Sequence, residues 1–475
     1  MDTNASFFIG MGLLVLDKTR EADLDKESRQ RLQRMFPPLE RWFEREVRSR
    51  TFYYPNKYLG DLVCAWLLHD YSRRSVEELR TATLDATAYW QEQSWGWGEH
   101  MSDVYANVML NQLSVVLLFA EHLPPEMRAA FQDLAQRLLV INDAFAGGPR
   151  VPLIRSYAFQ KSPHPTSFRE SIYDWKGQGM VPPTSYPADD LGHFFWERGW
   201  HDVFGAKAVH ARDHAFSCFG GNTAVARVEA DIRFGSVSTF PLMPSAEYKT
   251  WGLSWQSFPV AFWRQQGDWG FLRGRTVEQG QERCHPAIDK ARAYLDNALN
   301  QSSSPPITGQ TVALQQGDSI LVMRRMPVIV DSWDSVGDGL TLIEPHFTAQ
   351  SVEETESGWR LRLQYPERAV TVDCLRLPGT ASPLWTSGED GVASWRTELA
   401  GDSLRGARGF VALWLFHFGA KAGVEKVQLL PYSGARVPVP RSGSEQGGIV
   451  QWRDADGEQR AAFDPLSAKP LQWVR

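Results

Sequence analysis

The chain has 475 residues, 43% of them hydrophobic and 12% aromatic, and a formal net charge of −6. This length supplies a large core and exceeds one ordinary domain, so a small disulfide-stapled protein and an intrinsically disordered protein are excluded, and about two or three domains are expected. The charged residues form no long basic run, and we therefore expect no nucleic-acid partner.

Two apolar segments bear on localisation. Phe7–Leu16 is short, follows Asp2 instead of a basic lead-in and has no clear small-residue cleavage site, so it is not typical of a signal peptide. Phe410–Phe416 is far shorter than the roughly 20 apolar residues of a membrane-spanning helix. We expect a soluble protein without membrane insertion, a monomer or a homodimer, and the choice between a secreted, periplasmic or cytoplasmic location stays open.

The first part of the chain has helical periodicity. From about residue 30 to 146, apolar residues recur at the spacing of one helix face, and the connections between segments are short. Short connections predict antiparallel helical hairpins. The predicted helices cover Arg31–Arg48, Lys57–Tyr71, Val76–Gln91, Met101–Glu121 and Pro125–Phe145.

The period changes further along the chain. Glycines and prolines interrupt residues 147 to 190, which predicts an irregular crossing segment. Beyond it, short alternating segments and turn residues such as those of Asp454–Gly457 predict an antiparallel β-sandwich. We expect a helical domain over 1–190, crossing segment included, and a β-sandwich domain over 191–475. Predicted strands lie in Thr223–Phe234, Ser319–Val330, Trp359–Tyr365, Ala369–Leu377, Gly409–Phe418 and Lys426–Leu430, with one helix at Ala287–Leu299.

A row of polar residues on an apolar helix is the first chemical signal. Leaving a buried polar group unpaired costs about 1–3 kcal/mol, so such a row faces either hydrogen-bonding partners on another helix or a wet cleft. Trp95 and Trp97, beside glycines at the start of this helix, are either sugar-stacking platforms or plugs at the end of the bundle. The row consists of His100, Asp103, Asn107, Asn111 and Ser114, spaced 3, 4, 4 and 3 residues apart.

Candidate metal ligands are few. On a strand, His210 and His214 would point to the same side and, with Asp213 or His201, could hold zinc; solvated or hydrogen-bonded histidines are the alternative. We expect no cofactor, with a structural zinc or calcium ion as the open alternative. The cysteines match no metal-ligand or redox spacing and are expected to be small buried side chains: Cys64, Cys218, Cys284 and Cys374.

Three short motifs carry a family resemblance. Glu99-His100 followed by Asp103-Val104-Tyr105 is similar to the helix start of the heparinase II/III-like polysaccharide lyases and related alginate lyases. Arg155-Ser156-Tyr157 resembles the tyrosine motif some 55 residues later in that family, and His210–Ser217 resembles its histidine-rich phrase. The resemblance implies an α+β multidomain protein, with an N-terminal incomplete α/α toroid of helical hairpins followed by a C-terminal antiparallel β-sandwich.

The chain departs from this family at two points. Glu99 stands where the family has an asparagine that neutralises the substrate carboxylate, and the gap from Tyr157 to His214 is shorter than usual, so the toroid should be reduced to about three hairpins. The chondroitin and hyaluronan lyases of the same superfamily, with a tyrosine nine residues after a histidine, would instead select His164 and Tyr173. Both assignments stay open.

The resemblance implies β-elimination on an acidic polysaccharide or oligosaccharide. Removing the C5 proton of a uronic acid requires neutralisation of its carboxylate, a base for that proton and an acid for the leaving O4. No metal is needed for these steps. The implied catalytic residues are Tyr157, His100 and His214, with Tyr173 and His164 as substitutes, and the implied substrate-binding residues are Glu99, Asn107, Arg155, Trp95, Trp97 and Asn111.

Two other function classes fit the sequence. A glycoside hydrolase on a helical toroid would use two carboxylates, such as Glu99 with Asp103 or Glu170 with Asp174, although such spacing is common on ordinary helices. A non-catalytic glycan-binding protein would use tryptophans of the β domain for sugar stacking, although these are also typical of a sandwich core. The tryptophans concerned are Trp251, Trp255, Trp263 and Trp269.

Overall fold

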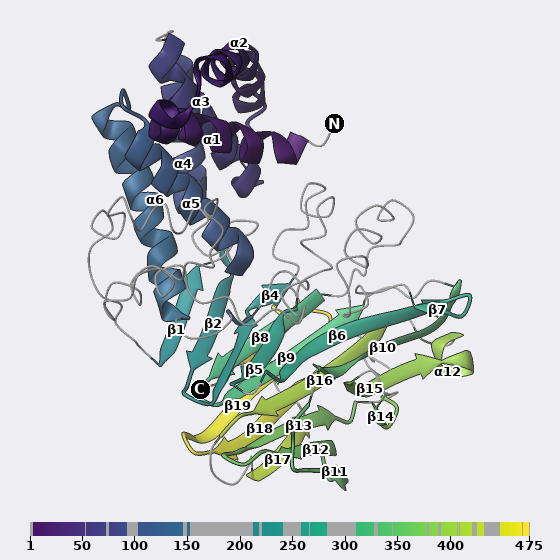
Figure 1. Ribbon diagram of the computed structural model, residues 1–475. Coiled ribbons are helices and arrows are strands. Elements are labelled where there is room, and N and C mark those ends of the chain that lie inside the picture. The colour runs from purple at the N-terminus through teal and green to yellow at the C-terminus, as the bar shows by residue number, and fades with distance from the viewer. Residues whose placement is uncertain are drawn as a thin grey trace. The chain divides into compact units, whose positions relative to one another are not determined.

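The chain forms two compact units, one helical and one built of β-strands (Figure 1). The helical unit extends to Arg150, and the β unit contains Val151, Pro152, residues 212–216 and the described residues from Gly221 onward. The computed structural model describes residues 3–52, 54–72, 76–92, 103–145, 150–152, 212–217, 221–240, 258–265, 267–282, 310–326, 331–343, 345–377, 380–387, 391–405, 407, 409–419, 425–431, 447–467 and 469–474.

All five helices predicted from periodicity are confirmed, with ends shifted by a few residues. One further helix precedes them and contains the apolar segment Phe7–Leu16, which the sequence analysis left without a structure. A short 3-10 turn, Glu21–Asp23, joins it to the next helix. The helices are α1 Thr3–Arg20, α2 Lys26–Arg48, α3 Pro55–Ser72, α4 Glu77–Glu92, α5 Asp103–Phe119 and α6 Pro125–Ala144.

Three of these helices form an inner layer in which all run in the same direction. Helix α3 lies between α1 and α5 and contacts both. Each neighbour makes two contacts with α3, and the contact that comes first along the neighbour also comes first along α3, which fixes the common direction. Between α1 and α3, Cys64 Sγ lies 3.6 Å from Phe7 O, and Lys18 Nζ lies 2.8 Å from Asp70. Between α5 and α3, Gln112 Nε2 lies 2.8 Å from Asn56 O, and Glu121 N lies 3.0 Å from Asp70.

The other three helices pack outside this layer and run the opposite way. The Tyr58 hydroxyl near the start of α3 donates to Val47 O at the end of α2 (2.7 Å). The Arg128 guanidinium near the start of α6 donates to Leu117 O near the end of α5 (2.7 Å). The helices therefore form three hairpins, α1–α2, α3–α4 and α5–α6, which confirms the reduced α/α arrangement that the sequence predicted.

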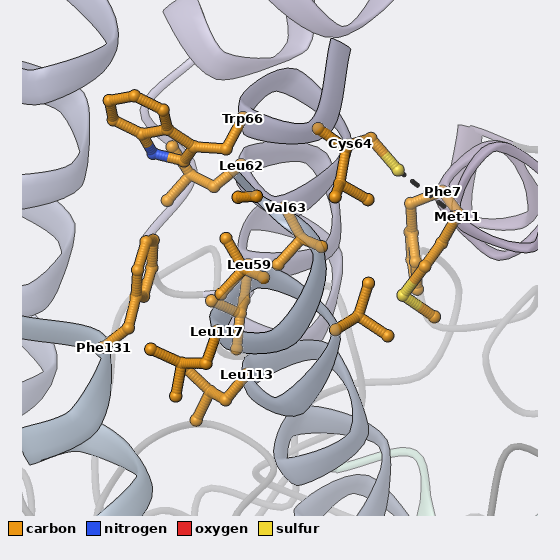
Figure 2. Close-up of a cluster of buried hydrophobic side chains, with 14 of the residues drawn as sticks. Phe7, Met11, Leu59, Leu62, Val63, Cys64, Trp66, Leu113, Leu117 and Phe131 are labelled. Carbon is orange, nitrogen blue, oxygen red and sulfur yellow. Dashed lines mark hydrogen bonds between the residues drawn. The ribbon is translucent and has the colours of Figure 1, made fainter. Parts of the chain in front are cut away.

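Burial explains which helices are inner. Helix α3 packs between two inner neighbours and the outer layer, and Figure 2 shows its Cys64 side chain directed at Phe7 of α1. On the outer side, Trp66 Nε1 donates to Thr83 Oγ1 of α4 at 3.0 Å. A helix surrounded in this way is apolar on nearly all sides, whereas an outer helix needs only one apolar stripe. Helix α2 has such a stripe, with Leu32, Phe36, Phe43 and Val47 buried.

The described strands of the β unit form three sheets whose recorded pairings are antiparallel. Sheet A has nine strands, in the order β1-β2-β3-β5-β6-β10-β15-β14 with β7 beside β6. Sheet B has the order β11-β12-β13-β16-β9-β8-β4, and sheet C the order β17-β18-β19-β20. The strands are β1 Asp213–Ser217, β2 Thr223–Val228, β3 Ile232–Val237, β4 Thr239–Phe240, β5 Val260–Arg264, β6 Trp269–Glu278, β7 Gln281–Glu282, β8 Gln310–Gln316, β9 Ser319–Met326, β10 Trp333–Ile343, β11 Ala349–Thr355, β12 Gly358–Gln364, β13 Ala369–Leu375, β14 Leu384–Ser387, β15 Val392–Ala400, β16 Phe410–His417, β17 Glu425–Pro431, β18 Gly448–Asp454, β19 Gly457–Phe463 and β20 Leu471–Trp473, and a short helix α12 spans Gly401–Arg405.

The β unit has three layers, one more than a two-sheet sandwich. One core cluster joins sheets A and B, and a second joins the opposite face of sheet B to sheet C. Sheet B is therefore covered on both faces, and strands covered in this way lose the alternation of polar and apolar residues. This explains why Phe410–Phe416 is continuously apolar: β16 lies in the middle layer.

Most strand predictions are confirmed, with one difference of detail. Thr223–Phe234 divides into β2 and β3, which pair around a turn near Asp231. The hairpin predicted at Asp454–Gly457 joins β18 to β19, with Asp454 opposite Gly457. The helix predicted at Ala287–Leu299 and nearly all of the crossing segment lie outside the described residues, and the boundary between residues 190 and 191 stays a prediction.

The interface between sheets A and B contains a group of buried polar side chains. Asp338 of sheet A lies 2.6 Å from the Arg324 guanidinium of sheet B and accepts a hydrogen bond from Trp414 Nε1 at 2.9 Å. Burial raises the pKa of Asp338 to about 6, against the opposing attraction of Arg324. These contacts fix sheet A against sheet B, because a shift would leave a buried charge without its partner.

Candidate functional site

Most of the predicted site residues lie outside the part of the chain that the structure describes. Asn107 is within α5, but its side chain is also outside the description, and only Asn111, Ser114 and His214 can be examined in detail. The residues outside the description are Trp95, Trp97, Glu99, His100, Arg155, Tyr157, His164 and Tyr173.

Asn111 is a half-buried amide in the apolar inner layer. Its Oδ1 atom is shielded from solvent and accepts no hydrogen bond. A buried acceptor without a donor costs about 1–3 kcal/mol, so an asparagine in this state is a poor choice for stability alone. Its carbonyl can accept a hydroxyl of a bound molecule, and its amino group can donate to a carboxylate.

Ser114, one turn further along the same face, has a different environment. It is fully buried, and its hydroxyl donates to Leu110 O of its own helix at 2.7 Å. Such a bond to the preceding turn satisfies a buried hydroxyl without any outside group. Ser114 is therefore satisfied within its own helix and faces neither a cleft nor a hydrogen-bonding partner on another helix, the two alternatives that the sequence left open.

Gln112 lies outside the row of polar residues that helical spacing predicted. It is fully buried, and its Nε2 atom donates to Asn56 O of α3 at 2.8 Å, while its Oε1 atom is buried without a donor. Gly60 of α3 makes this approach feasible, because a Cβ atom there would lie 2.9 Å from Gln112 Nε2 and 2.4 Å from the Phe7 ring. An amide inside an otherwise apolar segment was the only sequence signal.

A buried charged cluster lies in the first turns of α3. Lys57 Nζ is 2.6 Å from Asp61 Oδ2 and 2.8 Å from Glu46 Oε2 of α2. Burial raises the pKa of Asp61 to about 7, although Lys57 opposes the rise. Burial alone would lower the pKa of Lys57, but the attraction of Asp61 and Glu46 raises it. A lysine between two carboxylates remains charged and fixes the start of α3 against α2.

Two of these polar groups meet at the start of α3. Asn56 and Lys57 lie in its first turn, and Gln112 of α5 donates to Asn56 O there. Because α1, α3 and α5 run in the same direction, their amino ends point to the same end of the unit. Helix amino ends carry a partial positive charge that falls off within the first turn. Asn111 lies about two turns inside α5, so its environment is set by the packing of the inner layer.

His214 lies on the edge strand β1. Its ring is half-buried and stacks on Phe216, with centroids 5.9 Å apart and an interplanar angle of 9°. Asp213 is exposed, and its carboxylate lies 3.5 Å from Arg227 Nη1. Successive strand residues point to opposite faces, so Asp213 and His214 lie on opposite sides of β1. His201 and His210 lie outside the described residues, and a zinc site stays an open alternative. Among the described residues no group of three or more His, Cys, Asp or Glu side chains could hold a metal ion.

A serine, a histidine and an aspartate meet between sheets B and C. Ser319 Oγ donates to Asp454 Oδ2 at 2.7 Å and lies 3.1 Å from His417 Nδ1. A nucleophilic serine instead needs the histidine as acceptor of its proton. Ser319 is fully buried, and burial lowers the pKa of His417. This group is therefore a structural contact between two layers.

Other sequence expectations concern buried side chains. Trp263 and Trp269 are opposite each other on β5 and β6 and are only 3% and 5% exposed, which is incompatible with open sugar-stacking platforms. Cys64 and Cys374 are buried free thiols, as expected, and burial raises the pKa of both. The described helices include none that is long and apolar enough to span a membrane. Trp251, Trp255, Cys218 and Cys284 lie outside the described residues.

Comparisons with known proteins place solved polysaccharide lyases among the similar structures. No protein-family model matches the chain, and no curated protein does. A mutant heparan sulfate lyase from Pedobacter heparinus is similar at 8% sequence identity and a TM-score of 0.41, over 86% of this chain and 66% of that one. A heparinase III with methylated lysines is similar at 8% identity and a TM-score of 0.37, over 86% of this chain and 65% of that one. The chain thus spans about two thirds of the length of these two proteins.

Proposed function

We propose that the protein is a polysaccharide lyase that cleaves a uronic-acid-containing polysaccharide or oligosaccharide by β-elimination. The observation that carries the proposal is the polar face of α5. It lies in an otherwise apolar inner layer and contains Asn111, whose buried amide oxygen accepts no hydrogen bond from the described residues. The order of a three-hairpin helical unit and an antiparallel β unit adds support, because the sequence motifs predict the same order.

The roles follow from what elimination requires. Asn107 and Arg155 would contact the carboxylate of the uronic acid, and Asn111 and Glu99 would be further substrate-binding residues. Tyr157, with His100 and His214 as partners, would accept the C5 proton and supply a proton to the leaving O4. In the alternative assignment, Tyr173 and His164 would do so. A developing enolate is stabilised by such donors only when they are fixed in advance. Gln112 contributes by holding α5 against α3 beside Asn111.

The test is ultraviolet absorbance during incubation with a panel of uronic-acid polysaccharides, with reducing ends measured on the same samples. Elimination produces a C4–C5 unsaturated product that absorbs, and the responding polysaccharide identifies the substrate class. New reducing ends without absorbance would instead establish hydrolysis. They would favour one of the carboxylate pairs, Glu99 with Asp103 or Glu170 with Asp174, as the catalytic residues. No change in either assay, across the panel, would contradict catalysis and favour glycan binding.

Three substitutions connect activity to particular residues. Tyr157→Phe and His100→Ala should each abolish turnover with little change in thermal stability, and chelator treatment should leave activity intact. Full activity in Tyr157→Phe would remove that assignment. If Tyr173→Phe also remained active, a tyrosine mechanism would be untenable.

A further inference from the structure

Five arginines lie along the solvent side of helix α2. They are spaced 3, 7, 4 and 3 residues apart, which places them on one face of the helix, because these intervals are close to one or two full turns. The buried stripe of α2, which contains Phe36 and Phe43, lies on the opposite face. We call the five residues the arginine strip: Arg31, Arg34, Arg41, Arg45 and Arg48.

The arginine strip is open to solvent along its whole length. The side chains of Arg31, Arg45 and Arg48 are 74%, 62% and 59% exposed. Arg34 and Arg41 are exposed as well. From its first to its last residue the strip is about 25 Å long, so an extended ligand could contact several guanidinium groups at once.

The strip contains more arginines than carboxylate partners. The ion pairs are Arg31 with Glu27, Arg45 with Glu46 at 3.0 Å, and Arg48 with Glu78 of α4 at 2.6 Å. No described residue forms an ion pair with Arg34 or Arg41. The remaining carboxylates of α2, Glu40 and Glu44, are half-buried and have partners outside the strip. Five guanidinium groups and three carboxylates leave two positive charges, in a chain whose formal net charge is −6.

The order of charges differs between α2 and the other outer helices. Arg41, Arg45 and Arg48 follow one another at intervals of one turn, a spacing at which like charges repel. The exposed faces of α4 and α6 instead contain opposite charges one turn apart, Glu77 with Arg80 at 3.4 Å and Asp133 with Arg137 at 2.9 Å. A row of like charges opposes helix stability, whereas a bound polyanion would remove the repulsion.

One arginine of the strip is held in place by an aromatic ring. The guanidinium carbon of Arg45 lies 4.2 Å from the centroid of the Trp42 ring, and Trp42 Nε1 donates to Ser6 Oγ of α1 at 3.2 Å. This contact keeps the cation over the indole face. A side chain that is already ordered loses less rotamer freedom when it binds a ligand.

Two prolines add hydrogen-bond acceptors in the middle of the strip. Pro37 and Pro38 lie inside α2 and have no N–H group, so the carbonyl oxygens of Gln33 and Arg34 lack the helical donor four residues on. Gln33 and Arg34 are both exposed. Their carbonyl oxygens can therefore accept hydroxyl groups of a ligand.

These features together select one kind of polyanion. Guanidinium groups bind carboxylates and sulfates through paired hydrogen bonds. Exposed carbonyl oxygens need a ligand that also donates. An acidic sugar chain carries both anionic groups and many hydroxyl donors, whereas a nucleic acid or an anionic lipid surface offers mainly the anions.

We propose that the arginine strip binds the acidic polysaccharide along α2, with its carboxylate or sulfate groups on Arg34 and Arg41. The strip is on an outer helix, whereas Asn111 lies on α5 of the inner layer, so the proposal adds a second place at which the helical unit holds the polymer. The choice of a uronic-acid polymer rests on the proposed function, and the preference for an acidic sugar chain rests on the strip alone.

The test measures binding apart from turnover. The double variant Arg34→Gln with Arg41→Gln breaks no ion pair between described residues, so its fold should be intact. It is compared with wild type on immobilised alginate, which carries carboxylates only, on heparan sulfate, which also carries sulfates, and on neutral dextran. We expect about fivefold weaker binding to at least one acidic polymer, a difference that decreases as salt screens the charges, and no binding to dextran.

A matched control removes two exposed arginines of the β unit. Arg362→Gln with Arg405→Gln changes the net charge equally and should alter binding less than about twofold. Equal weakening in the two double variants would overturn the proposal, and so would a wild type that binds neither acidic polymer.

A third variant should strengthen binding. Glu27→Gln removes the carboxylate that pairs with Arg31 and should raise the affinity for the responding polymer about twofold. Unchanged or weaker binding, in a variant whose circular dichroism matches wild type, would contradict the strip as the site.

Two further ligands test the choice of a sugar chain. Wild type is measured on double-stranded DNA and on phosphatidylserine vesicles, and binding should be weaker than to the responding polysaccharide. Equal or stronger binding to either, lost in the Arg34 and Arg41 double variant, would overturn the assignment to a polysaccharide. Because these assays need no turnover, absence of elimination activity in wild type would refute the proposed function and leave the binding result standing.

Discussion

The middle sheet of the β unit and the inner helix layer of the helical unit differ in how their buried polar groups are paired. In the β unit, the buried polar groups described above join neighbouring layers: Asp338 connects sheets A and B, and Ser319 connects sheets B and C. In the helical unit, the Oδ1 atom of Asn111 in the inner layer accepts no hydrogen bond from the described residues. A polar group that joins layers is explained by stability, whereas a buried acceptor without a donor is better explained by a ligand.

The largest expected effect tests the β unit. Asp338→Leu leaves Arg324 buried without its carboxylate and should lower the free energy of unfolding by about 3–5 kcal/mol, whereas the double variant Arg324→Met with Asp338→Leu should recover most of the loss. Urea unfolding followed by tryptophan fluorescence measures both. A double variant as unstable as the single one would show that the contact with Trp414, and not the ion pair, matters.

A smaller effect tests the packing of the inner helices. Gly60→Ala places a Cβ atom 2.4 Å from the Phe7 ring and should lower the free energy of unfolding by about 1–3 kcal/mol. Gly12→Ala is the control, because a Cβ atom there meets nothing within 4 Å, and alanine should raise stability by about 1 kcal/mol. Thermal unfolding by circular dichroism compares them, and equal effects would contradict the close approach of α1 and α3.

The pH dependence of the helical unit tests the charged cluster. Burial raises the pKa of Asp61 from 3.8 to about 7, so the folded state keeps a proton that the unfolded state releases. This contribution to stability is complete below about pH 4 and is lost as the pH rises through 7, with a slope of at most about 1.4 kcal/mol per pH unit.

Asp61→Asn should remove that slope from the helical transition, measured by far-ultraviolet circular dichroism at several pH values. Burial also raises the pKa of Asp338 and Asp373 to about 6, so the informative quantity is the difference between wild type and variant. An identical pH profile in the variant would mean that Lys57 keeps Asp61 ionised throughout.

The smallest expected effect on stability accompanies a large one on activity. Asn111→Ala removes the unpaired oxygen but also side-chain packing in the inner layer, and these opposite effects should leave the free energy of unfolding within about 0.5 kcal/mol of wild type, while turnover or substrate binding weakens. Ser114→Ala, on the same helix face, is the matched control and should keep activity, because its hydroxyl bonds within the helix. Reduced activity in both variants would indicate a packing effect on α5.

Periodicity predicted the fold class and most elements, because helix and strand spacing are local properties of the sequence. It did not predict α1, whose apolar residues lie on nearly all sides and therefore lack the stripe of an outer helix. Nor did it predict sheet C as a third layer, although the continuous apolar run of β16 is a consequence of that layer. In both units, an apolar segment without periodicity forms part of a covered layer: α1 in the inner helix layer and β16 in sheet B.

The site was less accessible to sequence reasoning. The spacing from His100 to Ser114 predicted one helix face, and the structure separates Ser114, bonded within the helix, from Asn111, which is not. Gln112 and Lys57 were missed because their roles depend on Asn56, Asp61 and Glu46, which come from other helices or other turns. Such tertiary partners leave no pattern in the sequence.

The middle position of sheet B has a consequence for synthesis of the chain. Its strands are complete at His417, whereas the strands of sheet C begin at Glu425 and end at Trp473. Until those strands leave the ribosome, the face formed by Leu321, Leu413 and Leu415 has no cover. A nascent or truncated chain would therefore present a broad apolar β surface, which makes late translation the stage at which chaperone binding or aggregation is favoured.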